Sequence, residues 1–73
     1  MARIVISEFM DGPAVQALAG RFDVDYRPRL VEDAGALEAA LPLAQAWIVR
    51  NRTQVRGRLL QAATSLRVVG RLG

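Results

Sequence analysis

The residues best suited to chemistry follow the third of four short apolar segments. Arg50, Asn51, Arg52 and Thr53 run from the end of segment 46–50 into a helical pattern. In open α/β sheets ligands bind beyond the carboxyl ends of strands, and a helix start there adds free N–H groups and partial positive charge. Arginines at such a point favour a carboxylate or phosphate. The alternative is that Thr53 only caps a third helix and that the arginines are solvated.

A second candidate follows the fourth apolar segment. Gly70, Arg71, Leu72 and Gly73 resemble the start of a glycine-rich turn, although G-x-x-G alone is no phosphate-binding fingerprint and a flexible end is the alternative. Ser7–Glu8, after the first segment, could face the same edge, but a capping or solvated role is favoured for this pair. The sequence shows no paired carboxylates and no nucleophile–base pair, so no catalytic residue is assigned.

The elements that must position these residues follow a simple alternation. Apolar, β-branched segments at 3–7, 23–26, 46–50 and 66–70 predict strands, and Trp47 in the third is expected in the core. Helices are predicted between them: one opened by 11–13 with Gly20 as a left-handed C-cap, one capped by 32–33 and stopped by Pro42, and one capped by Thr53. This β-α-β-α-β-α-β order predicts an α/β fold with a parallel sheet.

Composition narrows the classes of function. The 73 residues contain no Cys and no His, which excludes disulfides, a Cys/His metal site and a histidine acid–base. No apolar run is long enough for a membrane span and no signal peptide is evident, so a cytoplasmic location is expected. All seven acids lie in residues 1–38 with four Arg (−3), whereas residues 39–73 hold six Arg and no acid (+6). The basic half predicts an anionic partner.

At these residues the chain resembles a known family. The segments Ile4–Glu8, Ala46–Val55 and Leu66–Gly73 are similar to the opening of D-isomer-specific 2-hydroxyacid dehydrogenases, with phosphoglycerate dehydrogenase and sulfolactate-type members nearest in pattern. After the third strand the family typically has two aliphatic residues followed by V-R-[ST/N]-x-T-x-V. From the fourth strand it typically has L-[KR]-V-V-G-R-x-G-x-G. The first motif matches in full and the second as far as Gly73. The resemblance covers the whole chain but only about the first quarter of a typical member.

The resemblance implies a flavodoxin-like sheet of order 2-1-3-4, continued by a fifth strand in the family. It implies that residues 1–73 are part of a substrate-binding domain and that the Rossmann domain for NAD lies outside this chain. By the same resemblance, Arg50, Asn51, Arg52 and Thr53 lie beside the substrate, and Gly70, Arg71, Leu72 and Gly73 face its carboxylate. The ligand is then a small 2-hydroxy or 2-keto acid anion. The chain itself holds no cofactor and no catalytic group.

Two other classes of function remain open from the sequence. The chain could be a non-catalytic, self-associating module, because its fourth strand would have an open edge and an apolar face; a homodimer is expected on that ground. It could instead bind nucleic acid through its arginines, but it lacks an aromatic stacking surface, a helix-turn-helix pattern and a flexible basic arm, so no nucleic-acid or membrane partner is expected.

Overall fold

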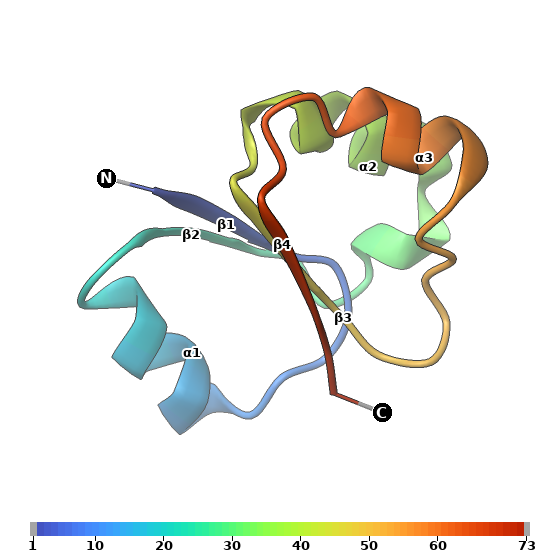
Figure 1. Ribbon diagram of the computed structural model, residues 1–73. Helices are drawn as coiled ribbons and strands as arrows, with labels where there is room; N and C mark the ends of the chain where they lie inside the picture. The colour runs from blue at the N-terminus through green and yellow to red at the C-terminus, as the bar shows by residue number, and fades with distance from the viewer. Residues whose placement is uncertain (1, 73) are drawn as a thin grey trace.

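The computed structural model describes residues 2–72. Four strands, β1 (Arg3–Ile6), β2 (Asp23–Tyr26), β3 (Ala46–Val49) and β4 (Val68–Arg71), form one parallel sheet. The spatial order is β2-β1-β3-β4, which confirms the order expected from the resemblance. Because β4 pairs only with β3, it forms one edge of the sheet, as Figure 1 shows.

The helices cover the two faces of the sheet unequally. Helix α1 (Gly12–Ala19) lies on one side, and α2 (Ala34–Ala40) and α3 (Gly57–Ala62) lie together on the other (Figure 1). Short 3₁₀ turns, η1 (Leu30–Glu32) and η2 (Leu41–Leu43), flank α2. The main core forms under α2 and α3, where Trp47 is fully buried as predicted. That core comprises Val5, Leu30, Leu37, Ala40, Leu41, Ala44, Trp47, Val49 and Ala63.

The first helix begins as predicted but ends differently. The Asp11 carboxylate accepts a hydrogen bond from the amide of Ala14 at 3.2 Å, so Asp11 is the N-cap, and Pro13 lies in the first turn of the helix. Gly20 was expected in the left-handed region, but its φ of −72° and ψ of −14° are right-handed. Its amide still bonds to the Gln16 carbonyl. The prediction was wrong because the helix ends by a continued right-handed turn, which any residue can adopt.

The second helix matches its predicted start and its predicted stop. The Asp33 carboxylate accepts from the amide of Ala36 at 3.1 Å, which makes Asp33 the N-cap. The α-helix ends at Ala40, and Pro42 falls inside the 3₁₀ turn η2 that follows. Proline cannot donate the backbone bond that would continue an α-helix, so the chain tightens there and turns into β3.

The third helix was predicted to start at Thr53, and this prediction was wrong. Helix α3 begins only at Gly57, and residues 50–56 form a loop. Both the amide and the hydroxyl of Thr53 are engaged by the end of β1, which holds Thr53 at the sheet edge. The chain then reaches the helix through Gly57, whose φ of +59° lies in the left-handed region that favours glycine.

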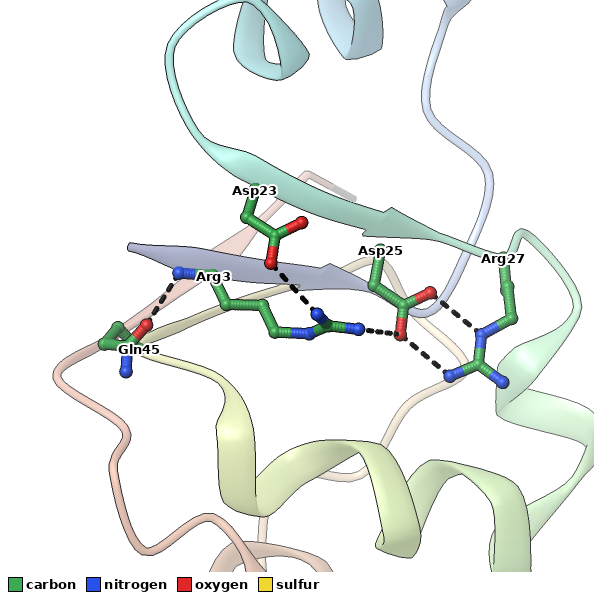
Figure 2. A network of polar contacts seen from close by, with 5 residues as sticks. All are labelled: Arg3, Asp23, Asp25, Arg27 and Gln45. Carbon is green, nitrogen blue, oxygen red and sulfur yellow. Dashed lines mark hydrogen bonds and ion pairs between the residues drawn. The ribbon is translucent and has the colours of Figure 1, made fainter. Parts of the chain in front are cut away.

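The two aspartates of β2 are paired with arginines, one on β1 and one just after β2. The guanidinium of Arg3 donates to Asp23 at 2.9 Å, and that of Arg27 donates to both oxygens of Asp25 at 2.9 and 2.8 Å. Figure 2 shows these side chains along β1 and β2, with Gln45 accepting from the Arg3 amide. The hydrogen bond from Arg27 lowers the pKa of Asp25. Charge on this side of the sheet is therefore compensated locally.

Candidate functional site

A buried carboxylate lies at the carboxyl edge of the sheet. Glu8 follows β1 and is only 3% exposed. Its Oε2 accepts from the amides of Arg50 at 2.8 Å and Thr53 at 2.9 Å, and its Oε1 accepts from the amide of Arg52 at 3.1 Å. Three N–H groups of the loop after β3 therefore converge on one side chain.

These hydrogen bonds keep Glu8 ionised. Burial by itself would raise the pKa of a carboxyl group, but the hydrogen bonds from the Thr53 side chain and from the amides of Arg50, Thr53 and Arg52 favour the charged form. The net effect is a Glu8 pKa below its ordinary value of 4.5. The loop thus rests on a fixed negative charge.

A chain of hydroxyl groups connects this carboxylate to the core. The indole Nε1 of Trp47 donates to the Ser7 hydroxyl at 3.0 Å, and the Ser7 oxygen lies 3.2 Å from the Thr53 hydroxyl oxygen. The Thr53 amide in turn donates to Glu8 at 2.9 Å, so Thr53 connects the two hydroxyl groups to the carboxylate. Every member of the chain is buried and satisfied.

The predicted site residues on β3 and β4 meet at one edge. A strand over 66–70 followed by a glycine turn from Gly70 was expected, and this was wrong, because Gly70 and Arg71 lie within β4. Val49 pairs with Arg71 in the sheet register, so the loop 50–53 begins beside the end of β4. The Arg71 guanidinium donates to the Arg50 carbonyl oxygen at 2.6 Å, which ties the end of β4 to the loop directly. Among residues 2–72, no carboxylate forms an ion pair with Arg50 or Arg71. Two uncompensated cations therefore lie at this edge.

The other predicted residues contribute unequally. The Arg52 guanidinium lies 3.4 Å from Glu32 in an exposed ion pair, and Asn51 is exposed. The Leu72 amide bonds to the carbonyl of Val49 at 2.9 Å, which extends the β4 pairing beyond Arg71. Gly73 lies outside the described residues. Thr53 is buried among Ser7 and Glu8, so it supports the loop from below.

Sequence reasoning undervalued Ser7 and Glu8. A capping or solvated role was favoured; the solvated role was wrong, because both are buried, whereas Glu8 does cap the backbone amides of the loop. The signal was present: a carboxylate follows a buried parallel strand at the edge where the next strand in the sheet releases a loop with free amides. A single sequence does not show which amides it reaches, since the partners lie 42 to 45 residues away.

The arrangement limits the chemistry of the site. The amides of Arg50, Arg52 and Thr53 already donate to Glu8, so these three groups are not free to bind an anion. The turn after β1 carries Glu8 and no glycine motif, and a carboxylate there repels a pyrophosphate; the residues do not fit a dinucleotide. Within residues 2–72, no group of His, Cys, Asp and Glu could hold a metal ion. No helix in that part of the chain is long and apolar enough to cross a membrane.

A shallow groove lies at the same carboxyl edge of the sheet, on the side of β2. It has a volume of about 430 Å³ and follows the end of β2. Its two flanking guanidinium groups, of Arg27 and Arg29, are paired with Asp25 and Glu32. Arg50 and Arg71 are not among the residues that line it. It is lined by Tyr26, Arg27, Pro28, Arg29, Leu30, Asp33 and Ala36.

Comparisons with known proteins agree with the fold and the motifs. No family model matches the chain. The structure is similar to that of the PH0520 protein from Pyrococcus horikoshii OT3, with a TM-score of 0.82, 19% identity, and coverage of 97% of this chain and 21% of that one. At this identity the likeness shows the fold alone, a parallel α/β sheet of the flavodoxin type.

A sequence relative indicates the family. The chain is 44% identical to (S)-sulfolactate dehydrogenase of Chromohalobacter salexigens over all 73 residues, and it spans 24% of that protein's length. The resemblance to 2-hydroxyacid dehydrogenases inferred from the motifs is thereby confirmed.

Proposed function

We propose that residues 1–73 are part of the substrate-binding domain of an NAD-dependent 2-hydroxyacid dehydrogenase, which oxidises a 2-hydroxy acid to a 2-keto acid. The similarity of all 73 residues to a part of sulfolactate dehydrogenase carries this proposal. The contact between loop 50–53 and the end of β4 at one sheet edge supports it. The chain spans about a quarter of that relative. Because these 73 residues contain no histidine and no phosphate-binding glycine motif, we assign the NAD site and the groups that move hydride and proton to other parts of such an enzyme.

The charges at this edge favour an anionic substrate. A 2-hydroxy acid carries a carboxylate, and sulfolactate carries a sulfonate as well. Arg50 and Arg71 have no carboxylate partner among residues 2–72, so either guanidinium can bind one of these groups in a fork geometry. Arg52 would first have to leave Glu32. The chain's part is thus to bind and orient the acid.

A segment exchange tests the proposal. The part of the Chromohalobacter salexigens enzyme that aligns with this chain is replaced by this chain, and oxidation of sulfolactate with NAD is measured. We expect activity to persist, because the exchanged segment supplies an equivalent fold and equivalent arginines. The matched controls are the unmodified enzyme and the same chimera carrying Arg50→Ala. A folded, NAD-binding chimera that oxidises no 2-hydroxy acid would contradict the proposal.

An assay of the isolated chain tests whether it has dehydrogenase activity of its own. Mixed with NADH and small 2-keto acids, it should give no absorbance change above the blank, because it has no histidine and no phosphate-binding glycine motif. Turnover that Arg50→Ala abolishes, and that therefore does not come from a contaminant, would show that the chain holds catalytic groups of its own.

A second candidate function is self-association. Strand β4 has a free hydrogen-bonding edge, and its Val68 and Val69 are 58% and 38% exposed. The neighbouring Leu72 is 45% exposed. An apolar edge strand of this kind is a template for pairing or packing with another chain. As the alternative function, we propose that two copies of the chain associate into a homodimer that covers β4.

A further inference from the structure

Glu8 holds the loop of the proposed site without belonging to its anion-binding surface. Glu8 is buried, and among residues 2–72 its carboxylate forms no ion pair with Arg50 or Arg71, the arginines that would bind a substrate. Burying a carboxylate costs solvation, and the hydrogen bonds from three loop amides offset that cost. The same hydrogen bonds fix the backbone of the loop at three points.

Both backbone polar groups of Arg50, its amide and its carbonyl, are hydrogen-bonded to side chains. Its amide donates to Glu8 at 2.8 Å, and its carbonyl accepts from Arg71 at 2.6 Å. The amides of Arg52 and Thr53 close the loop over the same carboxylate. With its backbone fixed at both ends, the Arg50 side chain starts from one defined point at the sheet edge, and its guanidinium has no carboxylate partner among residues 2–72.

The hydroxyl chain fixes Glu8 in turn. Trp47 is fully buried in β3 and donates to Ser7, which follows β1. Ser7 bonds to Thr53, and the Thr53 amide donates to Glu8. The position of the carboxylate is thus set by the core and not by solvent. Side chains locked by such supporting hydrogen bonds are what precise binding sites require.

We propose that Glu8 is a positioning residue for substrate binding, which acts by fixing the backbone of Arg50, Arg52 and Thr53 so that Arg50 meets the acid in one orientation. This inference rests on the proposed function. It assigns to Glu8 no contact with substrate. Loss of the carboxylate should release the loop amides and weaken binding of the acid, while the sheet and the other arginine side chains remain.

The test uses the whole chain with three variants. Glu8→Gln removes the charge and places N–H donors against the loop amides. Glu8→Asp keeps the charge but shortens the side chain, and it serves if the Gln variant does not fold. Glu38→Gln is the matched control, because Glu38 is an exposed carboxylate paired with Arg58 on another part of the surface. Amide hydrogen exchange and titration with sulfolactate, both followed by NMR, are measured for each.

The expected result has two parts. In Glu8→Gln or Glu8→Asp, hydrogen exchange at the amides of Arg50, Arg52 and Thr53 accelerates relative to the amides of the sheet. The affinity for sulfolactate falls about tenfold or more, because a binding group that is displaced even slightly loses much of its effect. Glu38→Gln leaves both unchanged. A folded Glu8 variant that keeps the wild-type affinity overturns the role of Glu8 alone. A wild-type chain that binds no sulfolactate contradicts the proposed function itself.

Discussion

The indole nitrogen of Trp47 lies 3.0 Å from the hydroxyl oxygen of Ser7, and both residues are fully buried. Ser7→Ala removes the acceptor and leaves a buried N–H without a partner. We expect this to lower the free energy of unfolding by about 1–3 kcal/mol, a large part of the stability of so small a domain. Thermal or urea unfolding measures it, with the exposed Ser65→Ala as control. Equal stability of the two variants would show that water replaces the lost acceptor.

The depressed pKa of Glu8 makes stability depend on pH. Its pKa in the folded chain lies below the ordinary value of 4.5, so its contribution is fully present above that value and is lost as the pH falls through the folded pKa. Glu8→Gln should therefore destabilise the chain most at neutral pH, and the difference from wild type should shrink below about pH 4.5. Urea unfolding at several pH values measures this. A difference that stays constant as the pH falls would contradict it.

Anion binding should depend on side chains and less on loop amides. We expect millimolar affinity for a small 2-hydroxy acid, about −4 kcal/mol, because each exposed charged contact contributes only about 0.5–1 kcal/mol. Arg50→Ala should abolish the NMR shifts around residues 50–53 and 70–72. Arg21→Ala, an exposed arginine at the end of α1, is the control. Identical losses in both variants would indicate unspecific attraction by net charge.

The exposed edge of β4 predicts concentration-dependent stability. If copies pair over Val68, Val69 and Leu72, the melting temperature rises with protein concentration, because association stabilises the folded state by mass action. Melts at several concentrations with light scattering measure this, and Val68→Lys should restore a monomer. Arg67 and Arg71 disfavour direct antiparallel pairing of two β4 strands, since like charges would meet. A melting temperature independent of concentration, with a monomeric mass, would contradict the homodimer.

The sheet could be predicted from the sequence because its signals are local. Apolar β-branched segments alternate with helical stripes, and right-handed connections leave few topologies for such a chain. Asp33 and Pro42 bounded α2 as their backbone chemistry requires. The resemblance to a known family then supplied the strand order.

The candidate site was harder because it depends on contacts between distant segments. Thr53 has the side chain of an N-cap, but Ser7 and Glu8 compete for its hydroxyl and amide, and this tertiary contact outweighs the local preference. Whether Glu8 is solvated or buried depends on the loop that covers it. A single sequence holds no record of that pairing.

The long span of the Glu8 contacts has a consequence for folding kinetics. The carboxylate reaches amides 42 to 45 residues further along the chain, so the contacts form only after β1 and β3 are side by side. We expect the loop to become ordered after the barrier to sheet formation has been crossed. A change at Glu8 should for this reason accelerate unfolding and leave the refolding rate nearly unaltered, which stopped-flow measurements in urea would resolve. The residue would in that way govern how long the folded chain persists and have little influence on how fast it forms.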